Sequence, residues 1–81
     1  MKVKQIKFIR WLDSCNCRTP NWKNKKDVAD LDPVEMHTVG FVVKETKKYI
    51  TVVGTRGQAD HYIGEMCIPK GTIIETQDIT V

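Results

Sequence analysis

A lone large aromatic residue lies among basic side chains in the segment 13–26, and this combination suits an anionic ligand that carries a base. Arg18, Trp22 and Lys23 fall within six consecutive positions. A tryptophan ring stacks on a nucleobase for about 1 to 3 kcal/mol, and arginine and lysine pair with phosphate oxygens. These three residues form the centre of the predicted ligand-binding site.

Four more residues are candidates for the same site. Arg56 and Lys70 lie in other predicted turns and can bring positive charge to the ligand. Asp13 and Ser14 either hydrogen-bond ribose hydroxyls or fix the loop. We favour the second role, because both side chains readily cap turns.

The two tryptophans are expected to differ in burial. Trp11 lies in a predicted strand, and we expect it in the core. Trp22 lies in a loop among Asn, Lys and Pro residues. We expect Trp22 to be half-buried against the body of the domain, and stacking on a ligand base is the alternative.

A zinc site is one chemistry that the cysteines suggest. Cys15 and Cys17 are close in sequence, and Cys67, His37 or His61 would have to complete four ligands. Structural zinc sites usually have two Cys or Cys/His knuckles, and here one Cys-x-Cys stands without a second. We therefore expect reduced thiols and no metal, in keeping with an odd number of cysteines.

The sequence does not favour catalysis. Ser14 or Cys15 as a nucleophile would need a histidine base held by an acid, and the two histidines lie in separate predicted strands. The segment 54–57 has two glycines but lacks the Lys-Ser/Thr pair and the following helix of a phosphate-binding loop. We predict a protein that is not an enzyme and needs no cofactor.

Positive charge is concentrated in the first third of the chain. Residues 1–26 contain eight Lys or Arg against one Asp, a net charge of +7, residues 27–35 carry −4, and residues 36–81 are balanced. An anionic partner would meet the basic third, whereas the plainer interpretation is a solvated surface. A nucleic acid would be contacted along its phosphates by six of these residues: Lys2, Lys4, Lys7, Arg10, Arg18 and Lys23.

The elements that position these residues are mostly strands. At 100° per residue the apolar side chains of residues 2–12 point all around a helix axis, so this segment is predicted to be a long bent strand. Residues 13–26 are rich in loop formers. Asn24 can cap a short helix over residues 25–30, which must end before Pro33.

The rest of the chain predicts an antiparallel sheet. The predicted strands cover residues 39–43, 49–53, 61–68 and 72–81, with a turn at 45–47, a loop at 54–60 and a β-turn at 68–71. We expect a mainly-β fold, a small SH3-like partly open barrel of five or six antiparallel strands with one short helix. Residues 1–81 are expected to form one domain.

The chain is small, with 81 residues and a mass of 9.3 kDa. A domain of this size buries only about 60% of its unfolded surface, so we expect a homo-oligomer, with the segment 73–81 as an exposed strand edge. No segment approaches the roughly 18 to 20 apolar residues of a membrane span, and Lys7 and Arg10 interrupt any signal-peptide core. We predict a cytoplasmic protein with no membrane partner.

Several short motifs occur in a fixed order along the chain. They are Trp11-x-Asp13-Ser14, Trp22, the Val-Gly-Phe-Val-Val run at 39–43, and Ile68-Pro69-Lys70-Gly71 ahead of an Ile-rich end. In this order they resemble a group of small proteins encoded by bacteriophages and prophages, from which the Cys15-Asn16-Cys17 segment departs. The resemblance implies a phage origin, the host bacterial cytosol, and a part in host takeover or in blunting bacterial immunity. It supplies no catalytic residues.

Two classes of function follow from these observations. In the first, the chain is a non-enzymatic phage accessory protein that sequesters a nucleotide-derived immune signal, or binds the host defence protein that makes or senses it. In the second, it is a nucleic-acid-binding small β-barrel. The low aromatic content and the spread of basic residues over both faces of the first strand favour the first class.

Overall fold

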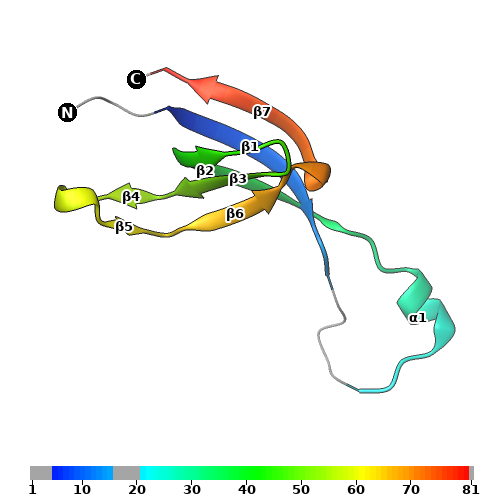
Figure 1. Cartoon of the computed structure of the whole chain (residues 1–81). Helices are drawn as coiled ribbons and strands as arrows, with labels where there is room; N and C mark the ends of the chain where they lie inside the picture. The colour runs from blue at the N-terminus through cyan, green and yellow to red at the C-terminus, as the bar shows by residue number, and fades with distance from the viewer. Residues whose placement is uncertain (1–4, 16–20, 81) are drawn as a thin grey trace.

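Segments rich in β-branched residues form most of the structure, a computed structural model that describes residues 5–15 and 21–80 (Figure 1). The strands are β1 (Ile6–Asp13), β2 (Val34–Glu45), β3 (Tyr49–Val53), β4 (Thr55–Arg56), β5 (Tyr62–Ile63), β6 (Met66–Pro69) and β7 (Ile73–Ile79). The helix α1 spans Lys25–Ala29, and the short 3-10 turns η1 and η2 span Gln58–Asp60 and Lys70–Thr72. The mainly-β fold with one short helix is confirmed.

Five strands form one antiparallel sheet in the order β6-β3-β2-β1-β7, and β4 and β5 form a separate two-stranded ribbon. The edge strands β6 and β7 do not pair with each other, so the sheet is open and does not close into a barrel. The described residues hold seven strands instead of the predicted five or six. The excess arises because the predicted strand at 61–68 is split and the predicted loop at 54–60 contains β4.

One face of the curved sheet carries the core. Ile9, Ile50, Ile68 and Val52 are fully buried, and Trp11 joins them with 8% of its surface exposed, as predicted. These residues come from β1, β3 and β6, strands that are distant in sequence but gathered by the sheet. The Trp11 indole N–H donates a hydrogen bond to Thr38 Oγ1 at 3.0 Å, which satisfies the only polar atom of this large side chain.

Several predicted boundaries need correction. The strand β2 begins at Val34, five residues before the predicted start, because it pairs with β1 as far as Asp13. The predicted strand at 61–68 is interrupted at Gly64, whose φ of +78° is a conformation that breaks a strand. The first strand is confirmed from Ile6 onward, and residues 1–4 lie outside the described part of the chain.

The molecule is elongated, with principal extents of 55 × 24 × 21 Å. The connection between β1 and β2 adds to this length, because it carries α1 away from the sheet (Figure 1). We call the described part of this connection, residues 14–15 and 21–33, the arm. Within the described residues, no helix has the length and apolar content needed to cross a membrane.

Candidate functional site

The arm holds the centre of the predicted ligand site, and its local structure follows from its sequence. The Asn24 side chain accepts a hydrogen bond from the backbone N–H of Asp27 at 2.8 Å, which caps α1 as predicted. Asp27 lies in the first turn, where the helix dipole favours an acid. The helix ends at Ala29, with Asp30 as its C-cap, ahead of Pro33.

A second contact joins the two sides of the arm near its base. The Cys15 thiol donates a hydrogen bond to the Asp32 carbonyl oxygen at 2.7 Å. Ser14 and Cys15 share a shallow pocket with Leu31, Asp32 and Pro33. The base of the arm is therefore held by β1, by β2 and by the hydrogen bond between Cys15 and Asp32, whereas α1 itself has no buried residue.

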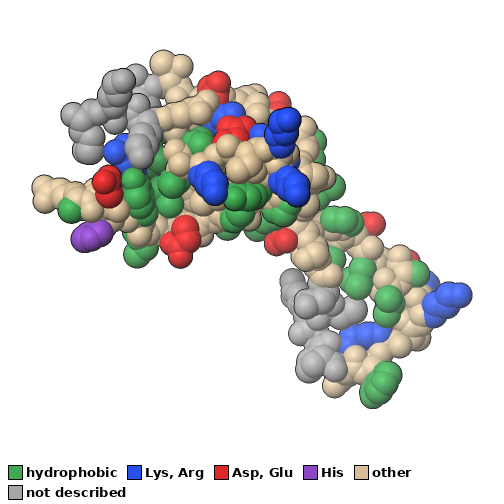
Figure 2. Space-filling model, in the orientation of Figure 1, with side chains coloured by type: hydrophobic (Ala, Val, Ile, Leu, Met, Phe, Trp, Pro, Cys, Tyr) green, Lys and Arg blue, Asp and Glu red, His purple; other side chains and the backbone are tan. Residues whose placement is uncertain are grey.

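Trp22 is the largest apolar side chain of the arm, and it is fully exposed, at 103% of its reference area. The prediction that it packs half-buried against the body of the domain is wrong. The arm to which Trp22 belongs extends away from the sheet (Figure 1). Val28 and Leu31 on the same arm are also exposed. Figure 2 shows hydrophobic and basic side chains interspersed over this part of the surface.

The charge of the arm changes sign along the chain. Lys23, Lys25 and Lys26 follow Trp22, and the Lys23 ammonium donates to the Asn21 carbonyl oxygen. Asp27, Asp30 and Asp32 come next, so the described arm has as many acids as bases. A surface with both signs of charge matches another mixed surface better than it matches a uniformly anionic phosphate chain.

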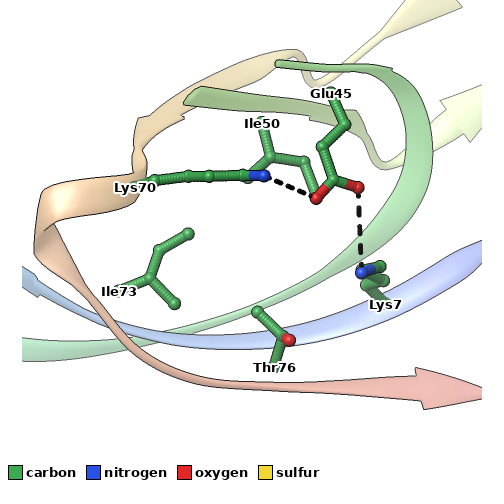
Figure 3. Close-up of a pocket in the computed structure, with 6 residues that line it drawn as sticks. All are labelled: Lys7, Glu45, Ile50, Lys70, Ile73 and Thr76. Atoms are coloured by element: carbon green, nitrogen blue, oxygen red, sulfur yellow. Dashed lines mark ion pairs between the residues drawn. The ribbon is translucent and has the colours of Figure 1, made fainter. Parts of the chain in front are cut away.

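Lys70 lies elsewhere, at a pocket of about 230 Å³ on the core side of the sheet (Figure 3). Its ammonium is 2.8 Å from the Glu45 carboxylate, and Lys7 is 3.8 Å from the other oxygen of the same group. The hydrogen bond from Lys70, with Lys7 nearby, lowers the pKa of Glu45 below its usual value. Lys7 also lies 3.7 Å from Asp78, so two acids face the two lysines and leave little net positive charge for a phosphate.

Arg56 is not near the arm either. It lies on β4, at the opposite end of the molecule from α1 (Figure 1), and its guanidinium stacks over the Phe41 ring at 5.7 Å. Asp13 is the last residue of β1 and pairs with Val34, so it helps to position the arm. Arg18 lies outside the described residues. The fold therefore keeps Trp22 and Lys23 together and places Arg56 and Lys70 apart from them.

The other face of the sheet carries an ion-pair cluster that the sequence analysis missed. Arg10 lies 3.6 Å from Glu75 and 3.9 Å from Glu35, and His37 lies 2.8 Å from Glu35. The hydrogen bond from His37 lowers the pKa of Glu35, and Arg10 lowers it further. The strand register brings Arg10 opposite both His37 and Glu75, and spacing along the chain cannot reveal this.

Metal ligands do not gather in the described part of the chain, where no three His, Cys, Asp or Glu side chains form a cluster that could hold an ion. Cys15 and Cys67 are both free and exposed. Comparisons with protein-family models, curated proteins and solved structures give no match for this chain. The geometry of the arm and the sheet is therefore the basis for a functional proposal.

Proposed function

We propose that this chain is a non-enzymatic binding module whose arm docks onto a protein partner. The observation that carries the proposal is the fully exposed Trp22 side chain on an arm that reaches beyond the sheet. A large exposed apolar residue costs free energy in water, and tryptophan is among the residues that contribute most to protein interfaces. Val28 and Leu31 extend the apolar surface around it.

Electrostatics favours a protein over a nucleotide or a nucleic acid as the partner. Lys7 and Arg10, two of the residues expected along phosphates, pair with acids on neighbouring strands. Lys70 pairs with Glu45. The arm carries lysines followed by aspartates, a pattern that complements a partner surface with acidic and basic patches side by side.

The resemblance to phage-encoded proteins suggests the class of partner. For a short phage protein that works in the host cytoplasm, we propose a host defence protein, which the arm would block. Occupying a functional surface requires no catalytic group, in keeping with the absence of a catalytic motif in the sequence.

The test is a photo-crosslinking residue with a large aromatic side chain, placed at position 22 so that an aromatic ring still occupies it, in the full chain produced in bacteria that carry active defence systems. A crosslinker at Val39, which is exposed on the sheet, is the matched control. The crosslinked defence protein is then purified, and its affinity is measured by calorimetry. We expect Trp22→Ala to weaken binding at least tenfold, the range of a central interface residue, and Val39→Ala to leave it unchanged.

Other outcomes would overturn the proposal. A nucleotide retained by the purified chain in native mass spectrometry, and lost in Trp22→Ala, would assign the arm to a small anionic ligand. Binding to DNA or RNA that falls steeply with salt would support the nucleic-acid alternative. Equal crosslinking from positions 22 and 39 would show that the arm is not the interface with the partner.

A further inference from the structure

The strand β7 is an unprotected edge of the main sheet. It is seven residues long, six of its residues are exposed, and it contains neither proline nor glycine nor lysine. The opposite edge, β6, has only four residues and ends at Pro69, which has no N–H to donate. Proteins usually block a long edge strand, so an open one favours pairing with another strand.

The hydrogen-bond pattern shows which residues of β7 direct their backbone N–H and C=O groups toward the free edge of the sheet. The Val42 N–H donates to the Gln5 carbonyl oxygen at 2.8 Å. Because the direction of the backbone groups alternates along a strand, the odd-numbered residues of β1 form their backbone hydrogen bonds with β2. The even-numbered residues of β1 must then bond to β7, where their partners include Gln77 and Glu75. Thr76 consequently presents its backbone N–H and C=O to the free edge, and so does Asp78.

The acids of β7 protect this edge only in part, because basic side chains of β1 offset some of their charge. Glu75 lies 3.6 Å from Arg10, and Asp78 lies 3.7 Å from Lys7. Asp78 also accepts a hydrogen bond from the Gln5 side chain at 2.8 Å. These contacts offset part of the negative charge of β7, so a second strand can approach wherever the register does not set two acids directly opposite each other.

We infer that β7 pairs antiparallel with β7 of a second copy, which joins two sheets into one continuous ten-stranded sheet. Residues whose backbone groups face the free edge must pair with the same kind of residue in the second copy. These residues are all even-numbered, so the two-fold axis passes through a residue of β7 and not between two residues. An axis at Glu75 or Asp78 would place like charges directly opposite each other, which is unfavourable. Of the axes that keep at least five residues of each β7 strand paired, only those at Thr76 and Gln77 remain, and neither sets acid against acid.

This arrangement has a consequence for the arms. The arm extends from the end of β1 that pairs with Ile73, and the two β7 strands run in opposite directions. The two arms therefore project from opposite ends of the joined sheet. Such a dimer is bivalent, and it binds a multimeric partner more tightly than one arm alone does.

Sedimentation of the full chain with Thr76→Asp tests the pairing. In both allowed registers the new acid faces another acid, either its own copy or Asp78 of the second chain. We expect a dimer for the unmodified chain at tens of micromolar and an at least tenfold weaker dimer for Thr76→Asp. The neutral Thr76→Asn variant is the matched control and should dimerise normally. Thr76 lines an open pocket, so a side chain of the size of Asp or Asn has room there within one chain.

A second measurement does not depend on the stability of that variant. With Cys15, Cys17 and Cys67 replaced by serine, Thr76→Cys or Gln77→Cys is oxidised, and the residue nearest the axis should form a disulfide-linked dimer. Val39→Cys, on the central strand β2, should not. A monomer at 100 micromolar, or a dimer that Thr76→Asp leaves intact, would overturn the inference. Neither result would bear on the arm, whose test uses crosslinking at position 22.

Discussion

At the scale of single residues, Glu45 shows how one carboxylate ties separate parts of the sheet together. It ends β2 and contacts Lys7 from β1 and Lys70 from η2 (Figure 3). Because these contacts lower its pKa in the folded state, Glu45 stabilises the fold above its unfolded pKa of about 4.3. That contribution is lost as the pH falls through the lower folded value.

The first prediction concerns this pH dependence. Glu45→Gln should lower the free energy of unfolding at pH 7 by about 0.2 to 1 kcal/mol, the range of exposed ion pairs. The difference between variant and unmodified chain should shrink as the pH falls below about 4.3, and it should vanish once the pH is below the lowered folded pKa, where the carboxylate is protonated and resembles the amide. Urea unfolding at several pH values measures both quantities. A difference that stays constant from pH 7 to pH 3 would contradict the assigned contacts.

Gly40 is the residue where the sheet leaves least room. A Cβ atom at this position would lie 2.9 Å from the Val53 carbonyl oxygen and 3.1 Å from Val52 Cβ. The backbone of β3 would have to shift to accept it. Gly71, by contrast, has no atom within 4 Å of the corresponding position.

The second prediction compares these two glycines. Gly40→Ala should destabilise the fold by about 1 to 3 kcal/mol, as overpacking in a core does, and Gly71→Ala should change stability by less than about 0.5 kcal/mol. Thermal unfolding of the two variants side by side is sufficient. Equal melting temperatures would show that β2 and β3 are not packed as closely as described.

At the scale of elements, α1 depends on its cap more than on packing. It has five residues, none of them buried, and a helix this short is marginal in water. The Asn24 side chain supplies the hydrogen bond that holds its first turn.

The third prediction is that Asn24→Ala opens α1 without unfolding the sheet. Losing the cap should cost about 1 kcal/mol, and this cost should appear only in the helix. Amide exchange in Asp27 and Val28 should accelerate, while the melting temperature of the sheet stays the same. Slower or unchanged exchange would mean that another contact holds the helix.

Among the elements, the strand bounds predicted from the sequence agree with the structure for β3 but not for β2. The bounds of β3 agree with those predicted, because β-branched residues are bounded on both sides by polar turn residues. The first residues of β2, from Val34 to Thr38, lie outside the predicted strand, although Val34 and Met36 alternate with Glu35 and His37 in the period-two pattern of a strand. They are extended because β1 lies beside them and supplies backbone partners.

At the scale of the whole molecule, the core and the arm are energetically separate. Ile68 is fully buried between strands, whereas Trp22 has no contact surface on the sheet. Removing a buried isoleucine leaves a cavity in a core of six buried apolar residues within the described part of the chain.

The fourth prediction follows from this separation. Ile68→Ala should destabilise the fold by about 2 to 5 kcal/mol, whereas Ile63→Ala, at a position that is 69% exposed, should cost less than about 0.5 kcal/mol. Trp22→Ala should leave the melting temperature within a few degrees of the unmodified chain. A large loss of stability in Trp22→Ala would assign the tryptophan to the core and remove it from the proposed interface.

Local sequence was sufficient for the strand content, the Asn24-capped helix and the burial of Trp11. Periodicity, capping and turn residues act over a few positions, so they can be read along the chain. The exposure of Trp22, the pairing of Lys70 with Glu45 and the distance of Arg56 from the arm were decided only by the tertiary structure. Strand order and register bring together residues that lie far apart in sequence, and hydrophobic burial over the whole sheet, not any local pattern, selects that register.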